Sequence, residues 1–243
     1  MSKIVKRGYS PDDPKEFGSQ SLEKLYKAGK DLQYLLNQGY QIKGASTFVG
    51  NHYLLSERQR LALVRAVSSE ESIKMRKTKE IENIPHGSTV NIDGFNTIIT
   101  LEVALSDSLL LKCMDGTIRD LAALRGTYRL IDKTETAIIW IGKTLEMNRV
   151  GKAVFYLDSP VSNSGRLKQR IMELLNSFNF EVQVEVIHNV DAVLEKLDYV
   201  ITSDAIILDK CTSWINLNAK ILENIAERNQ YIDFFGDKVI ENN

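Results

Sequence analysis

The sequence predicts an α/β fold, in which a doubly wound, mostly parallel sheet follows a helical N-terminal part. Up to Gly87 the apolar residues recur at helical spacing, and after Gly87 short apolar runs alternate with helical stretches. Such alternation is typical of parallel strands joined by crossover helices. Pro85-His86-Gly87 breaks the chain between the two patterns. We therefore expect a helical N-terminal domain (residues 1–87) and a PIN-like α/β domain (residues 88–243), whose PIN character rests on motifs given below.

The N-terminal part begins with an irregular arm, residues 1–18, which carries two of the four prolines. A helix is predicted over 19–37, and residues 44–50 are expected to form a loop. Ser56 and Gln59 have the spacing of a capping box and predict a helix that starts there. Ser68 and Glu71 repeat this spacing, so a further helix should run to about Ile81. Its basic residues are expected on the solvent side, with a nucleic-acid contact as the alternative: Lys74, Arg76, Lys77 and Lys79.

In the second part, short runs rich in apolar and β-branched residues predict strands, and amphipathic stretches predict helices. The expected strands are 90–92, 109–111, 153–157, 180–187, 199–202 and 214–215. The expected helices are 133–148, 165–178, 191–197 and 218–228.

Composition narrows the function classes. The 243 residues carry 31 basic and 32 acidic side chains, so bulk charge does not indicate a nucleic-acid binder. No run approaches the ~18 apolar residues of a membrane span, and the N-terminus lacks a signal-peptide pattern. Cys113 and Cys211 fit a reducing cytosol, and no Cys/His cluster has zinc spacing. We expect a cytoplasmic protein with no membrane partner, and no nucleotide cofactor because glycine-rich phosphate motifs are missing.

Four aspartates are expected at one edge of the sheet. Asp93, Asp158 and Asp204 fall at or near the carboxyl ends of predicted strands, and Asp191 opens a helix that leads toward Asp204. Ligands of open parallel sheets bind at this edge. Clustered carboxylates repel one another unless a cation neutralises them, and Mg²⁺ or Mn²⁺ prefers oxygen ligands. Aspartate is also an ordinary cap of turns and helices, so four together make the functional interpretation about as strong as the capping one.

Two stretches resemble PIN and NYN ribonuclease domains. Val90-Asn91-Ile92-Asp93-Gly94-Phe95-Asn96 is similar to their opening strand, and the segment from Asp191 through Thr202-Ser203-Asp204 resembles their second half. The resemblance covers about residues 88–220. It implies a Mg²⁺ or Mn²⁺ site formed by Asp93, Asp191 and Asp204, with Asp158 as a fourth catalytic member. A further acid is usual in the middle of such domains, and four residues compete for that role: Glu102, Asp115, Asp120 and Glu135.

Ala205-Ile206-Ile207-Leu208 departs from the polar residues that normally follow the last aspartate, which leaves open a degenerate, non-cutting member. The whole chain also resembles a mainly archaeal family of unknown function, through residues 45–53 and 110–121. That second resemblance implies no activity.

Other polar residues are assigned to the substrate. Asn96 would orient a water molecule or a phosphate oxygen, and the loop with Ser162 and Ser164 would bind phosphate through backbone N–H groups, unless it is an ordinary capped turn. Arg119 and Arg125 would hold RNA phosphates, although a solvated basic face is the favoured alternative for them.

The leading hypothesis is a metal-dependent ribonuclease or related phosphodiesterase, in which metal-bound water attacks RNA. The helical part would position RNA or mediate a homodimer. The alternatives are a non-catalytic PIN-like protein or RNA interaction module, and an enzyme that acts on a small phosphorylated molecule.

Overall fold

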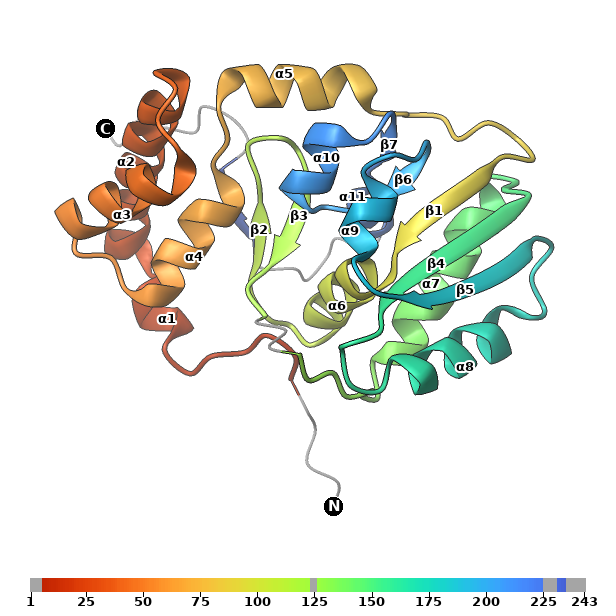
Figure 1. Ribbon diagram of the computed structural model, residues 1–243. Coiled ribbons are helices and arrows are strands. Elements are labelled where there is room, and N and C mark those ends of the chain that lie inside the picture. Colours follow the sequence, from red (N-terminus) through yellow and green to blue (C-terminus); the bar gives the residue numbers. More distant parts are fainter. Residues whose placement is uncertain (1–5, 123–125, 225–230, 235–243) are drawn as a thin grey trace.

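The computed structural model describes residues 6–122, 126–224 and 231–234, and its largest feature is a five-stranded sheet (Figure 1). All neighbouring strands in this sheet run parallel. Their order is β5-β4-β1-β6-β7, with bounds Thr89–Asp93 (β1), Lys152–Asp158 (β4), Glu181–Ile187 (β5), Val200–Ile201 (β6) and Trp214–Ile215 (β7). The predicted α/β fold with a mostly parallel sheet is confirmed.

The strand order places a topological switch point between β1 and β6. From β1 the chain continues outward through β4 to β5, and then returns to the other side of β1 to form β6 and β7. The crossover helices therefore diverge at the carboxyl ends of β1 and β6. In open α/β sheets this is where a crevice forms and ligands bind. Asp93 ends β1 at this point.

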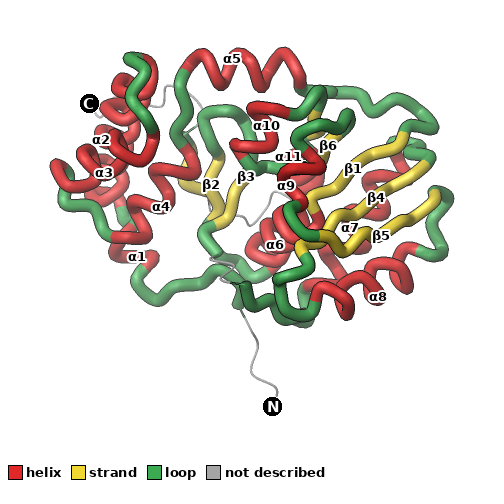
Figure 2. Tube along the Cα trace, in the orientation of Figure 1, coloured by secondary structure: helices red, strands yellow, loops and turns green. Residues whose placement is uncertain are grey.

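The two faces of the main sheet contribute to different cores because successive residues of a strand point to opposite sides. Ile92, Phe155 and Ile201 belong to the larger core, whereas Tyr156 and Val200 belong to a smaller one. The larger core includes residues of α6 (Gly94–Leu105), α7 (Thr134–Met147), α8 (Ser164–Leu175) and α11 (Leu217–Glu223). The smaller core includes residues of α9 (Val190–Leu194) and α10 (Ala205–Lys210), so helices cover both faces (Figure 2).

The N-terminal helices share a third core with a second sheet. Leu25 and Leu63 pack there with Leu111 and Ile232. Residues of α2 (Ser19–Asn37), α3 (Ile42–His52) and α4 (Glu57–Ala66) belong to this core. The N-terminal part also includes α1 (Asp13–Glu16) and α5 (Glu70–Lys79). In this sheet β2 (Leu110–Lys112) pairs antiparallel with β3 (Ile118–Asp120) and parallel with β8 (Tyr231–Asp233). Among the described residues, no helix has both the length and the apolar character needed to cross a membrane.

Local predictions for the N-terminal part were right in two places and wrong in three. Residues 1–18 were expected to form an irregular arm, but Asp13–Glu16 form helix α1. The helix over 19–37 and the capping box of Ser56 and Gln59 are confirmed. Residues 44–50, expected as a loop, instead lie within helix α3. The helix expected from Ser68 is capped by Ser69, whose Oγ accepts a hydrogen bond from the N–H of Ser72. The cap is therefore Ser69, and not Ser68 as the spacing had predicted.

Candidate functional site

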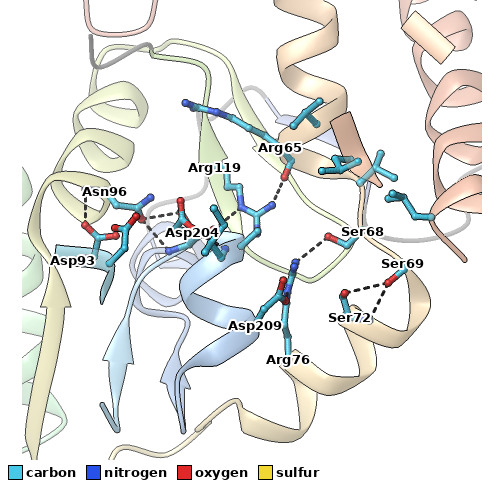
Figure 3. Close-up of a pocket in the computed structure, with 18 of the residues that line it drawn as sticks. Arg65, Ser68, Ser69, Ser72, Arg76, Asp93, Asn96, Arg119, Asp204 and Asp209 are labelled. Carbon is cyan, nitrogen blue, oxygen red and sulfur yellow. Dashed lines mark hydrogen bonds and ion pairs between the residues drawn. The ribbon is translucent and has the colours of Figure 1, made fainter. Parts of the chain in front are cut away.

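A cleft of about 780 Å³ lies between the carboxyl edge of the main sheet and the N-terminal helices. All four predicted aspartates line it, together with Asn96: Asp93, Asp158, Asp191 and Asp204. Figure 3 shows Asp93, Asn96 and Asp204 grouped at one end of the cleft and Arg65, Ser68, Ser69 and Ser72 toward the other. The fold thus brings together acids that lie as far as 111 positions apart in the chain, from Asp93 to Asp204.

Asp93 is buried at the end of β1, where it also caps α6. Its Oδ2 accepts a hydrogen bond of 2.8 Å from Thr202 Oγ1, and its Oδ1 accepts one of 3.4 Å from the N–H of Asn96. Burial raises the pKa of Asp93 to about 7, and repulsion from Asp204 and Asp191 adds to this rise, while the two hydrogen bonds oppose it. Near pH 7 this carboxyl group is therefore partly protonated when no cation is bound.

Asp204 follows β6 and caps α10. Its Oδ1 accepts hydrogen bonds from the N–H groups of Ile206 (2.7 Å) and Ile207 (3.4 Å). Beside it, Asn96 Oδ1 accepts hydrogen bonds of 2.9 Å from both the N–H and the hydroxyl of Ser203. Within the described ranges, Asp204 Oδ2 and Asn96 Nδ2 form no hydrogen bond. This acceptor and this donor are thus available to a ligand.

Asp158, at the end of β4, and Asp191, in α9, line the same cleft. With Asp93 and Asp204 they form the set of four carboxylates that we call the acidic edge. Asp158 Oδ1 accepts a hydrogen bond of 3.4 Å from the N–H of Val190, which ties the end of β4 to the start of α9. Partial burial raises the pKa of Asp191, and repulsion from Asp204 and Asp158 raises it further. This mutual influence agrees with the placement of all these carboxylates along one cleft.

The donor chemistry of the acidic edge fits a hard divalent cation, but no cage is preformed. Of the residues that the structure describes, no group of three or more His, Cys, Asp or Glu side chains is arranged to hold a metal ion. Both oxygens of Asp93 and one of Asp204 already accept hydrogen bonds. Mg²⁺ commonly uses one or two carboxylates and completes its shell with water and substrate phosphates. The edge therefore suits a cation that binds together with a phosphate ligand.

Charge in the cleft is unevenly compensated. Its arginines are all paired: Arg65 with Asp120, Arg119 with Asp115, and Arg76 with Asp115 and Asp209. In contrast, none of the four strand-edge aspartates forms an ion pair with a lysine or arginine of the described chain. The acidic edge therefore repels a phosphate group until a cation neutralises it.

Two of the basic residues for which a solvent-facing position was expected or favoured are buried. Arg76 was expected on the solvent side of its helix, which is wrong: it is 3% exposed and bound to Asp115. Arg119 lines the cleft, yet it is buried, and its nitrogens bind Asp115, the carbonyl of Ser203 and the carbonyl of Arg65. Arg125 lies outside the described residues.

The predicted phosphate loop lies away from the cleft lining. Ser162 accepts a hydrogen bond from the N–H of Tyr128, and Ser164 is buried at the start of α8. Asn163, at a φ of 64°, occupies the cap position of that helix. These contacts join the loop to residues 126–128, and the Asn163 side chain donates to the carbonyl of Tyr128 and does not cap α8.

The four candidates for a further acid are separated by the fold. Asp120 lines the cleft and binds Arg65 and Thr100. Asp115 is buried behind it, between two arginines. Glu102 is buried elsewhere, bound by Arg7, Tyr128 and Thr134, and Glu135 pairs with Arg170 at the surface. Asp120 is therefore the member of this set that stands at the cleft.

Sequence reasoning missed two groups of residues at the site. Thr202 and Ser203 bind Asp93 and Asn96 directly, and their position before Asp204 on a predicted strand was an available signal. Ser68, Ser69 and Ser72 line the cleft from the N-terminal part. No sequence signal indicates the latter, because only the packing of α5 near α10 brings them there.

Fold and cleft together define a class: α/β proteins with a mostly parallel sheet and a carboxylate-lined cleft at the switch point. More particularly, the chain belongs to the family described as "Domain of unknown function (DUF5616)", whose model matches residues 82–220. The model "Protein of unknown function (DUF434)" matches residues 24–79. The chain is 35% identical over 211 residues to "Uncharacterized protein MJ0935" of Methanocaldococcus jannaschii, covering 86% of this chain and 98% of the relative. No solved structure matches.

Proposed function

We propose that this chain is a PIN-like, metal-dependent phosphodiesterase that acts on RNA in the cytoplasm. The observation that carries the proposal is the set of four unpaired aspartates at the switch point of the sheet, contributed by four different segments. Its support includes the PIN-like and NYN-like motifs around Asp93 and Asp204. Purely structural caps would not require four acids to face one cleft, with Arg119 and Lys210 as longer-range cations near Asp204 and Asp191 and no direct ion pair among the described residues.

In this proposal Asp93, Asp191 and Asp204 hold Mg²⁺ or Mn²⁺, with Asp158 beside them. When bound, the cation offsets the carboxylates and supplies Lewis acidity toward the phosphodiester. Asn96 Nδ2 donates a hydrogen bond to a phosphate oxygen, and Thr202 keeps Asp93 oriented. Without the cation the pKa of Asp93 is about 7, so binding of the cation near neutral pH would release a proton from this carboxyl group.

The test compares the wild type with the double variant Asp93→Asn/Asp204→Asn and with Asp12→Asn as a matched control. Asp12 is exposed, and its side chain makes no capping bond. We expect the wild type and Asp12→Asn to cleave labelled single-stranded RNA in Mn²⁺, and the double variant to lose at least about a hundredfold in rate. Equal rates in all three proteins would contradict the assignment of the site.

A non-catalytic PIN-like RNA-binding protein is the second candidate, and one observation favours it: no group of three metal-binding side chains is prearranged among the described residues. Calorimetric titration of Mn²⁺, with and without RNA, separates the two candidates. Binding of RNA without Mn²⁺ uptake or cleavage would establish the second one.

A further inference from the structure

The peptide unit that joins Ser203 to Asp204 is held from both sides. Its carbonyl, on Ser203, accepts a hydrogen bond of 2.6 Å from Arg119 Nε. Its N–H, on Asp204, donates one of 3.0 Å to Thr202 Oγ1, and the Thr202 hydroxyl in turn donates one of 2.8 Å to Asp93 Oδ2. A continuous path of hydrogen bonds thus runs from a buried guanidinium group to the carboxylate of Asp93.

Arg119 is itself fixed at its other nitrogens. Nη2 binds Asp115 Oδ2 at 2.6 Å, and Nη1 donates to the carbonyl of Arg65 at the end of α4. With 6% of its surface exposed, Arg119 places one N–H of each of its three nitrogens on a protein acceptor. This planar, three-sided binding needs the fork of a guanidinium group, which the single ammonium group of a lysine cannot reproduce.

Asp115 links this path to the N-terminal helices. Arg76, on α5, donates a hydrogen bond of 2.6 Å to Asp115 Oδ2 and one of 2.7 Å to Asp209 Oδ1 near the end of α10. Figure 3 shows Arg76 beside Asp209 and Arg119 beside Asp204. Helix α10 is therefore held just before its first residue, through Ser203, and near its last, through Asp209.

We infer that Arg119 is a positioning residue of the candidate site, and that Asp115 and Arg76 hold it in place. It acts through the Ser203–Asp204 peptide, which sets where the Asp204 carboxylate stands and how Thr202 meets Asp93. The N-terminal helices thus support the geometry of the acidic edge as well as forming a wall of the cleft. The expected effect on catalysis rests on the proposed function. The expected effect on the position of the Ser203–Asp204 peptide rests on the contacts alone.

The test uses Arg119→Lys, with Arg7→Lys as the matched control. Arg7 also joins a buried carboxylate, Glu102, to a backbone carbonyl, but it lies away from the cleft. Amide hydrogen exchange of the full chain is measured without metal or substrate. We expect the N–H of Asp204 to exchange at least about tenfold faster in Arg119→Lys, whereas Arg7→Lys leaves it within about twofold. Equal acceleration in both variants, or none at Asp204, overturns the inference.

The catalytic consequence is read from RNA cleavage in Mn²⁺. Displacing catalytic groups by a fraction of an ångström lowers kcat more than it weakens binding, so Arg119→Lys should lose about tenfold or more in kcat with KM within about twofold. A rise in KM at unchanged kcat would instead make Arg119 a binding residue and overturn the inference.

Thr202 provides a second pair of variants that keeps the inference testable even where Arg119→Lys does not fold. Thr202→Ser keeps the hydroxyl that joins Asp204 to Asp93, and Thr202→Val removes it at nearly the same volume. Wild-type kcat in Thr202→Ser and a large loss in Thr202→Val support the path, and equal kcat in both overturns it. If the wild type cleaves no RNA, the proposed function fails, while the exchange comparison still decides the positioning role.

Discussion

Two aspartates of this protein are equally buried, yet the pKa of one is raised and the pKa of the other is lowered. Asp93 and Asp115 are each 8% exposed. Asp93 has other carboxylates as charged neighbours, and its pKa rises to about 7. Burial alone would raise the pKa of Asp115 as well, but Arg119, Thr117 and Arg76 outweigh it, and the pKa is lowered. The charge of Asp115 is compensated by arginines, as expected of a residue that stabilises the fold. The charge of Asp93 is not compensated, as expected of a residue that binds a ligand.

The largest expected effect comes from breaking the compensated cluster. Asp115→Ala leaves Arg76 and Arg119 buried without their shared carboxylate. We expect it to lower the free energy of unfolding by about 3–5 kcal/mol, measured by urea denaturation. Asp12→Ala, at an exposed position, should change it by less than about 0.5 kcal/mol. A loss below about 1 kcal/mol for Asp115→Ala would show that the cluster contributes little to stability.

The pH dependence of stability tests the uncompensated acid. Because the folded-state pKa of Asp93, about 7, exceeds the ordinary aspartate value of 3.8, the folded chain holds this proton more tightly than the unfolded chain. Protonation of Asp93 therefore stabilises the folded state by up to roughly 4 kcal/mol. This stabilisation is fully present below pH 4 and is lost as the pH rises to about 7.

Asp93→Asn removes this titration. The difference in unfolding free energy between variant and wild type, measured in EDTA, should shift in favour of the variant between pH 4 and 8. A difference that stays constant over this range would mean that Asp93 titrates normally.

A bound divalent cation should compensate the charge of Asp93, as arginines compensate the charge of Asp115. At a concentration a hundred times its dissociation constant, Mn²⁺ would stabilise the wild type by about 2.7 kcal/mol. Thermal unfolding with and without Mn²⁺ measures this effect. We expect Asp204→Asn to lose most of the shift and Asp12→Asn to keep it. An identical shift in all three proteins would place the bound cation elsewhere.

Glu102 offers an intermediate case and the smallest effect. Burial raises its pKa, while the charge of Arg7 and the hydroxyls of Thr134 and Tyr128 oppose the rise. Tyr128→Phe removes the hydrogen bond of 2.7 Å to Glu102 and should cost about 2 kcal/mol at neutral pH. Tyr156→Phe, whose hydroxyl makes a longer bond of 3.3 Å to Asn91, is the control and should cost less. The two losses are compared by urea denaturation at one pH.

Local patterns predicted much of the secondary structure and failed where distant packing intervened. The spacing of leucines over 19–37 and the capping pair Ser56 and Gln59 act within a few residues, so both were read correctly. Residues 44–50 looked like a loop because of their glycines. In α3, Gly50 instead faces Arg60: a Cβ there would lie 2.3 Å from Arg60 Nη1, and Arg60 Nη2 donates a hydrogen bond to the carbonyl of Gly50. That contact depends on how α3 and α4 meet.

The sequence by itself determined the alternation that produces a parallel sheet and the location of four aspartates at its carboxyl edge, because both follow from short-range periodicity and strand direction. The tertiary structure decided which charges are neutralised. Arg119 and Arg76 read as solvent-facing or ligand-binding residues, yet both are buried. Asp115, the nearby partner of Arg119, also binds Arg76 from 39 positions away, and the other partners include Ser203, 84 positions from Arg119, and Asp209, 133 positions from Arg76. Such pairings depend on the free energy of burying a charge with its counter-ion, which no local pattern of residues encodes.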